Sequence, residues 1–255
     1  MSFNAPITID NNGDVGAFTS VTIGSDSFPI ISYYDQTNGN LKIVHCESES
    51  CNSFHVPLAL DGTNINSNVG WDTSIAIGFD NTPIVSYYDV TNKDLKVAKC
   101  SNQACTGVFS RTTLDSFGDT GRFSNLSIGS DGTPIISYLR TSGSRFKFVK
   151  CLNNSCSQFV EPIEIESLSS GSFIGNIVIG LDSNPTLVTS RGLDFYHCTG
   201  LECISHTKTS LIPTSDFIND VSIALLSNGN PILSFYNNTT YTVSFYSCTN
   251  SDCTE

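Results

Sequence analysis

Short apolar runs alternate with turn-forming residues along the whole chain. Residues 73–114 show the unit clearly, with runs at 73–78, 83–88, 95–100 and 108–114 separated by Gly, Asn, Asp and Ser. Val, Ile, Tyr, Phe and Thr dominate the runs and favour strands, whereas the residues in the gaps favour tight turns. No stretch has the 3.6-residue period of an amphipathic helix. The pattern predicts four antiparallel strands per unit, here called A to D.

This unit recurs five times, and its strand B begins each time with proline. The five B runs are PIISYYD (29–35), PIVSYYD (83–89), PIISYLR (134–140), PTLVTSR (185–191) and PILSFYN (231–237). Four strands in roughly 50 residues are typical of propeller blades. We predict an all-β, five-bladed β-propeller in one domain, 1–255, with blades at about 14–61, 70–115, 121–167, 173–212, and 217–255 plus 3–9.

The two ends of the chain predict how the ring closes. Blade 1 ends S-F-x-x-P-x-x-x-D at 53–61, and the N-terminus has the same pattern at 2–10, whereas the chain stops at Glu255, before a strand D of blade 5. Closing the ring would protect sheet edges that are otherwise exposed. We therefore expect residues 3–9 to be the fourth strand of blade 5.

Cysteines mark the same repeat. Ten cysteines form five C-x4-C pairs, one at the end of each strand C: Cys46/Cys51, Cys100/Cys105, Cys151/Cys156, Cys198/Cys203 and Cys248/Cys253. Cysteines at the facing ends of strands C and D can reach disulfide distance, and five disulfides indicate an oxidising compartment. Zinc sites and redox motifs are the alternatives, but both are more typical of other spacings.

The repeat resembles the sialidase-like propeller repeats of bacterial and archaeal surface proteins. The string S-D-x-x-P-I-I-S-Y-Y-D-x-x-N-x-x-L-K-x-x-x-C carries the resemblance, at 25–46, 79–100 and 130–151. In sialidases an arginine triad grips the sugar carboxylate, and a Tyr–Glu pair with an Asp performs the chemistry. We do not find these catalytic residues in this sequence, so the resemblance implies the propeller fold alone.

Charge and hydropathy narrow the range of partners. The formal net charge is −12, which disfavours nucleic acid and anionic membrane surfaces. No apolar run approaches the roughly 18 residues of a membrane span, and the opening MSFNAPITID lacks the features of a signal peptide. We expect an extracellular or cell-surface location without membrane insertion.

Binding residues are expected on the face that carries the D–A and B–C loops, since the cysteine loops lie on the other. The first candidates are aromatic residues next to strand A, which can stack on sugars or pack between blades. The second are arginines of blades 3 and 4, suited to carboxylates but also able to pair with surface aspartates, and the third are the residues that end two B strands. The full set is Phe18, Trp71, Phe123, Phe173, Phe217, Arg122, Arg140, Arg145, Arg191, Asp35 and Asp89.

Catalytic chemistry is harder to place. The seven glutamates lie in cysteine loops, in D-strand regions or at the C-terminus, and the histidines precede cysteines or lie in D strands. No Ser–His–Asp set and no metal cluster emerges, so we expect no catalytic residue, metal or cofactor. The sequence favours a non-catalytic, lectin-like module that binds a glycan or a surface glycoprotein. The alternatives are a protein-binding or structural propeller and an unusual glycoside hydrolase.

Overall fold

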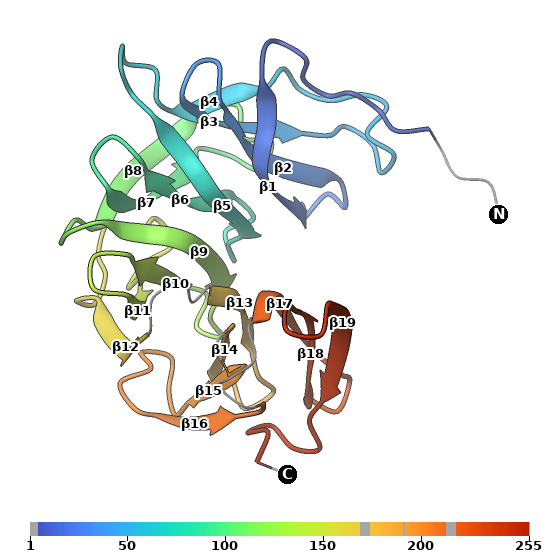
Figure 1. The fold of residues 1–255 in the computed structure, drawn as a ribbon. Coiled ribbons are helices and arrows are strands. Elements are labelled where there is room, and N and C mark those ends of the chain that lie inside the picture. The colour runs from blue at the N-terminus through green and yellow to red at the C-terminus, as the bar shows by residue number, and fades with distance from the viewer. Residues whose placement is uncertain (1–4, 169–173, 191, 213–217, 255) are drawn as a thin grey trace.

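The computed structural model describes residues 5–168, 174–190, 192–212 and 218–254, and in this part of the chain the predicted five-bladed, all-β propeller is confirmed. Figure 1 shows the five sheets following one another around an arc. Each sheet is antiparallel, with its strands in sequence order. No helix of the described residues is long and apolar enough to cross a membrane.

The first three blades have four strands each. Blade 1 contains β1 (Val15–Ile23), β2 (Pro29–Asp35), β3 (Asn40–His45) and β4 (Leu58–Asp61). Blade 2 contains β5 (Val69–Ile77), β6 (Pro83–Asp89), β7 (Asp94–Cys100) and β8 (Val108–Asp115). Blade 3 contains β9 (Thr120–Ile128), β10 (Pro134–Arg140), β11 (Arg145–Lys150) and β12 (Ile163–Ser167).

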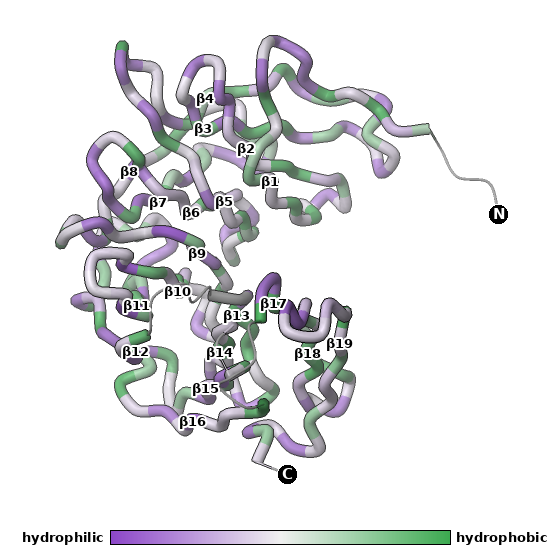
Figure 2. The backbone as a smooth tube through the Cα atoms, in the orientation of Figure 1, coloured by the Kyte–Doolittle hydropathy of each residue, from purple (hydrophilic) through white to green (hydrophobic). Residues whose placement is uncertain are grey.

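The last two blades differ in strand number. Blade 4 contains β13 (Ile174–Ile179), β14 (Pro185–Thr189), β15 (Asp194–Cys198) and β16 (His206–Ser210). Blade 5 has three strands in the described residues, β17 (Ile218–Leu225), β18 (Pro231–Asn237) and β19 (Thr242–Ser247). The hydrophobic and hydrophilic positions of Figure 2 alternate along the chain as the sequence pattern predicts.

The closing strand predicted at residues 3–9 is not formed in this structure. Residues 5–9 belong to no strand, and β19 pairs only with β18 in the described chain; the first two residues of the predicted strand lie outside that part. The N-terminal segment is instead held on blade 1, where the Asp10 carboxylate accepts hydrogen bonds from the Tyr33 hydroxyl and the Lys42 ammonium. In Figure 1 blade 1 and blade 5 stand apart, so a segment fixed to blade 1 does not reach β19.

Hydrophobic cores lie between consecutive blades. Four clusters fill the junctions 1–2, 2–3, 3–4 and 4–5, and each takes residues from both adjoining sheets. At the junction of blades 1 and 2, for example, Leu41 and Ile43 pack with Val85 and Tyr87. Successive side chains of a strand point to opposite faces, so one strand B serves two junctions.

The five predicted disulfides are confirmed. Every cysteine is bonded within its own C-x4-C pair, with Cα atoms 4.9–5.0 Å apart. The bonds are Cys46–Cys51, Cys100–Cys105, Cys151–Cys156, Cys198–Cys203 and Cys248–Cys253. Five such bonds are typical of an oxidising environment.

The second cysteine of a pair does not lie where the sequence analysis expected it, at the end of strand D. Cys156 and Cys203 lie in the loops that precede β12 and β16, outside any strand. Their φ angles of +53° and +50° turn each short loop back on strand C, so the loop alone brings the two sulfurs together. Both residues are buried in inter-blade cores, 0% and 1% exposed, and are therefore structural rather than accessible to a ligand.

Candidate functional site

Three predicted binding residues meet where the D–A loops enter the blades. The Trp71 ring stacks on Phe18 with centroids 5.2 Å apart and planes at 28°, and the Arg122 guanidinium carbon lies 5.2 Å from the indole centroid. These residues come from blades 1, 2 and 3, so the indole has a neighbour on each side. Arg122 donates from Nε to the Asp72 carboxylate at 2.7 Å, which fixes the cation over the ring.

The aromatic residues do not form a ring of equivalent positions. Phe18 and Phe123 share a bulge position with Asp72, and all three have φ near +50°. Trp71 precedes this bulge, and its equivalents are Ala17 and Arg122. The predicted neighbours Phe173 and Phe217 lie outside the described residues.

The predicted arginine group is brought together in part. Arg140 and Arg145 face each other across β10 and β11, and Arg122 lies on the adjoining strand β9. Each has a partner: Arg140 donates to the Ser142 carbonyl at 3.0 Å, and Arg145 pairs with Glu164 at 3.1 Å. Arg122 and Arg145 are thus paired with carboxylates, whereas Arg140 keeps its positive charge, since a carbonyl is an uncharged acceptor. The fourth predicted member, Arg191, is outside the described chain.

Asp35 and Asp89 are structural residues in this fold. They are 2% and 1% exposed, and each carboxylate accepts two hydrogen bonds from the asparagine three residues later, at 2.9 and 3.0 Å. The pattern D-x-T-N, present at both sites, places an asparagine where the aspartate side chain can hold the loop. These carboxylates cap the B–C loops, and Asp89 also lines the polar hollow described next.

A polar hollow lies on the same face, over blades 1 and 2. Its volume is about 340 Å³, and Asn64, Asn66, Ser67, Thr91 and Lys96 contribute to its lining, together with the exposed Ile65. A hydrogen bond from Tyr34 to Asn68, 2.8 Å long, links its border to the aromatic cluster, since the Tyr34 ring is 6.1 Å from Trp71. The sequence analysis missed this hollow because the residues of the loop after Asp61, GTNINSN at 62–68, are not part of the repeated pattern.

Inter-blade triads were also missed. A carboxylate at the end of one strand D accepts hydrogen bonds from a tyrosine and a lysine of the next blade. At Asp61 both bonds, from Tyr87 and Lys96, are 2.6 Å long. The triads are Asp10–Tyr33–Lys42, Asp61–Tyr87–Lys96, Asp115–Tyr138–Lys147 and Glu166–Tyr196–Lys208. The repeated S-Y-Y-D and L-K strings were the available signal in blades 1 and 2, whereas Tyr196 and Lys208 of blade 4 lie in neither string.

The triads keep their carboxylates charged. Burial alone would raise the pKa of Asp61 and Asp115, but the hydrogen bonds from lysine and tyrosine outweigh burial and hold each pKa below its ordinary value. The pKa values of Asp10 and Glu166 are lowered for the same reasons. A carboxylate with a lowered pKa is deprotonated at neutral pH and is therefore a poor general acid.

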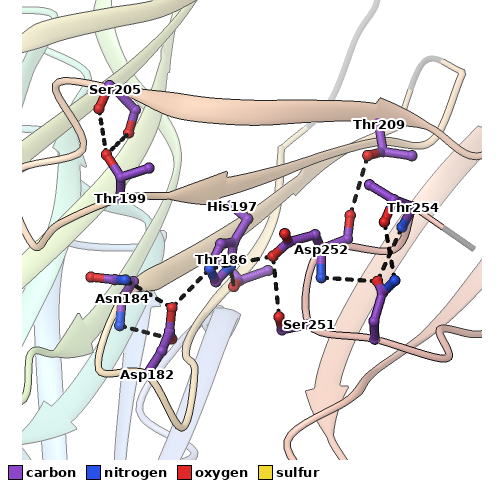
Figure 3. Close-up of polar contacts among 11 residues, drawn as sticks. Asp182, Asn184, Thr186, His197, Thr199, Ser205, Thr209, Ser251, Asp252 and Thr254 are labelled. Carbon is purple, nitrogen blue, oxygen red and sulfur yellow. Dashed lines mark hydrogen bonds and ion pairs between the residues drawn. The ribbon is translucent and has the colours of Figure 1, made fainter.

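A serine-hydrolase-like arrangement appears on the cysteine-loop face, in blade 4 (Figure 3). His197 places Nδ1 3.0 Å from the Thr186 hydroxyl and Nε2 2.8 Å from Asp182. Thr186 is 1% exposed, so its oxygen is closed to a substrate. The same turn aspartate pairs with Lys99 in blade 2 and with Lys150 in blade 3, which indicates a structural pair.

Another hollow on the cysteine-loop face measures about 550 Å³ and has Phe109 and Leu152 on its walls. The Asn153 side chain there is used by its own loop, since it bonds Ser157. Within the described residues no group of three or more His, Cys, Asp or Glu side chains could hold a metal ion.

Fold and site together define a disulfide-linked, five-bladed β-propeller with an aromatic–arginine cluster beside a polar hollow. No protein-family model matches the sequence, and no curated protein matches it either. Solved structures do resemble the fold. A protein of unknown function from Dyadobacter fermentans is 10% identical with a TM-score of 0.66, covering 98% of this chain and 83% of its own.

Two enzymes are also similar in structure. Virginiamycin B lyase from Staphylococcus aureus is 12% identical with a TM-score of 0.61, over 95% of this chain and 73% of the lyase. A thermostable family-43 glycoside hydrolase is 13% identical with a TM-score of 0.55, over 96% and 94% of the two chains. At such identities the likeness shows the fold alone.

Proposed function

We propose that this propeller is an extracellular, non-catalytic recognition module that binds carbohydrate over blades 1 and 2. The observation that carries the proposal is the polar hollow beside the cluster of Phe18, Trp71 and Arg122. Sugars are bound by amide and hydroxyl groups around an aromatic ring. The hollow supplies the polar groups, and Phe18, which is 39% exposed, supplies a ring. The glycan-active enzymes among the structural neighbours have the same fold, which is compatible with the proposal.

Charge in this region favours a neutral glycan. Arg122 is neutralised by Asp72, and Lys96 lies between Asp61 at 2.6 Å and Asp89 at 3.5 Å. An anionic sugar would have to approach these carboxylates without a free cation to receive it. Acidic glycans would bind instead at the Arg140 and Arg145 pair of blade 3, a separate place on the same face.

Non-catalytic binding agrees with how the nearby carboxylates are used. Glycoside hydrolysis needs one carboxyl group as an acid and another as a base or nucleophile. Asp35 and Asp89 cap turns, and Asp72 holds Arg122 and the Phe123 amide. We therefore expect binding without turnover.

A glycan array followed by titration of Trp71 fluorescence tests the proposal, since Trp71 is the single tryptophan. Asn64→Ala should weaken the binding of a neutral glycan by roughly 2- to 10-fold, the effect of one hydrogen bond. The matched control is Asn154→Ala, which changes an asparagine of the hollow on the other face.

The outcomes separate the three candidate functions. Affinity lost with Asn64→Ala and kept with Asn154→Ala supports a lectin-like site. A folded protein that binds no glycan would contradict it and favour a protein-binding or structural propeller. Release of a chromogenic aglycone would overturn the non-catalytic assignment.

A further inference from the structure

Two hollows on the cysteine-loop face occupy equivalent places in the fold. The hollow of about 550 Å³ described above lies at the junction of blades 2 and 3, and a second, of about 310 Å³, lies at the junction of blades 1 and 2. Each combines the A–B turn and the end of strand C of one blade with the cysteine loop of the next. The second hollow is lined by Asp26, Phe28, His45, Cys46, Glu47 and His55 of blade 1 and by residues 103–104 of blade 2.

In the larger hollow the chain supplies its own ammonium group. Lys99 donates from Nζ to the Asp80 carboxylate at 2.9 Å and to the Thr82 carbonyl at 3.0 Å, and all three residues line the hollow. Blade 3 repeats the pair, since Lys150 lies 2.6 Å from Asp131. The aspartate of the A–B turn thus binds an ammonium ion in both blades.

Blade 1 has a histidine at the position of this lysine. His45 precedes Cys46 as Lys99 precedes Cys100, and Asp26 is the turn aspartate of blade 1. The His45 Nε2 lies 3.0 Å from a carboxylate oxygen of Asp26 without forming an aligned hydrogen bond, and Nδ1 has no hydrogen-bond partner. The side chain is only 4% exposed. A buried ring with neither nitrogen bonded is unfavourable, which indicates a place for a polar group of a ligand.

The histidine of blade 4 shows that the missing bonds are particular to blade 1. His197 has Asp182 at one ring nitrogen and the Thr186 hydroxyl at the other (Figure 3). Thr186 lies opposite His197 on strand B, whereas the residue opposite His45 is Ile30, whose side chain has no polar group. Blade 1 therefore keeps the turn carboxylate but lacks both the ammonium of blades 2 and 3 and the hydroxyl of blade 4.

The remaining lining of the hollow is acidic. The Glu47 carboxylate lies 3.7 Å from His55 Nδ1, and the His55 ring stacks on His45 with centroids 5.6 Å apart. None of the described residues that line the hollow is a lysine or an arginine, so its two carboxylates favour a positively charged group. Since no set of three metal ligands converges in the described chain, an organic cation is favoured over a metal ion.

We propose that the hollow of blade 1 binds the primary ammonium group of a small organic amine. The ammonium takes the role that the Lys99 ammonium has in blade 2: it donates to the Asp26 carboxylate, and the uncharged His45 ring accepts a further hydrogen bond. Glu47 adds a second negative charge, and Phe28 provides an apolar wall for the alkyl part of the amine. This site lies on the face opposite to the proposed glycan site and does not depend on it.

A titration with n-butylammonium at pH 8, followed by NMR of the histidine ring protons, tests the proposal. The resonances of His45 and His55 should shift to saturation, whereas those of His197, whose ring nitrogens are both bonded, should stay in place. Butan-1-ol has the same chain without the charge, and tetramethylammonium has the charge without a donor. Both should bind at least about 10-fold more weakly, the effect of a charge-assisted hydrogen bond. Equal affinities for the three probes, or equal shifts at His197, would contradict the proposal.

Replacing the histidine by lysine tests the same site from within the chain. His45→Lys supplies the ammonium that Lys99 supplies in blade 2, so it should abolish the binding of n-butylammonium without lowering Tm. His197→Lys is the matched control and should leave the binding at blade 1 unchanged. A folded His45→Lys protein that binds the amine as tightly as before would overturn the proposal.

An aspartate variant keeps the test decisive if His45→Lys does not fold. Asp26→Asn retains the side-chain oxygen that accepts a hydrogen bond from the Phe28 amide, but it removes the charge. The affinity for n-butylammonium should fall at least about 10-fold, whereas Asp182→Asn in blade 4 should not change it. Equal affinities for the two aspartate variants would show that the carboxylate of blade 1 does not hold the amine.

Discussion

Blades 2 and 5 carry nearly the same strand B in very different surroundings. All seven residues of β6, PIVSYYD, are buried, whereas buried residues alternate with partly or fully exposed ones along β18, PILSFYN. Blade 2 lies between two neighbours, whereas in the described residues the buried core of blade 5 is shared with blade 4 alone. Burial in this molecule therefore depends on the neighbouring blade as much as on the strand itself.

The polar contacts differ in the same way. In blade 2, Tyr87 and Lys96 bind Asp61 of blade 1. Blade 5 has Phe235 and Ser244 at the positions of Tyr87 and Lys96, and the register of β16 puts Ile212 of blade 4 at the position of the carboxylate. Where the carboxylate is absent, the hydroxyl and the ammonium are absent as well. The triads are thus replaced as whole units, as expected when an unpaired buried charge is costly.

Acidification should have the largest effect, because it discharges all four triads together. Their pKa values are lowered in the folded protein, so their contribution to stability is complete above the unfolded values near 4 and is lost as the pH falls through the folded values. Melting curves between pH 7 and pH 2 should show Tm falling steeply below about pH 4. Hydrogen exchange should show blades 1–4 opening before the junction of blades 4 and 5, and uniform opening would contradict this order.

Removing one triad carboxylate should cost less than full acidification but more than any neutral contact. Asp115→Ala leaves Lys147 buried without its partner, and we expect the free energy of unfolding to fall by about 3–5 kcal/mol. A neutral contact across the junction of blades 4 and 5, the hydrogen bond that the Thr209 hydroxyl donates to the Asp252 carbonyl, is the comparison, and Thr209→Ala should cost no more than about 1 kcal/mol. Urea denaturation measures both, and equal losses would show that the triads are not what distinguishes the junctions.

The sequence predicts the parts of this fold that depend on local pattern. Strand order, blade number and disulfide pairing follow from period-two alternation, from proline at the start of strand B and from the C-x4-C spacing. The match of residues 2–10 to the end of blade 1 gives Asp10 the position of Asp61, but its contact with Tyr33 and Lys42 of blade 1 was not predicted. The same match does not place residues 5–9 beside β19, because that contact depends on how blades 1 and 5 stand relative to each other.

The candidate site was predicted less completely. Phe18, Trp71 and Arg122 do meet, because one face gathers the same end of every strand A. The loop-capping role of Asp35 and Asp89 was missed because it depends on an asparagine three positions away, and Asp89 lines the hollow as well. The polar hollow depends on the residues of the loop at 62–68, whose sequence does not recur in the other blades, so a comparison of repeats does not find it.

The smallest difference that we predict between blades 2 and 5 concerns the loss of a disulfide, which should destabilise both blades equally. Replacing both cysteines of a pair by alanine, either Cys100 and Cys105 or Cys248 and Cys253, opens loops of identical length. A disulfide stabilises mainly by restricting the unfolded chain, which gives about 2 kcal/mol for so short a loop whatever surrounds it. Both disulfides are also buried against the preceding blade, so the lost packing is similar as well. Urea titrations of the two double variants should therefore agree within about 0.5 kcal/mol. A much larger loss of unfolding free energy in blade 2 would mean that the disulfide stabilises the native state through its contacts. Its contribution would then depend on the neighbouring blades, as the burial of strand B does.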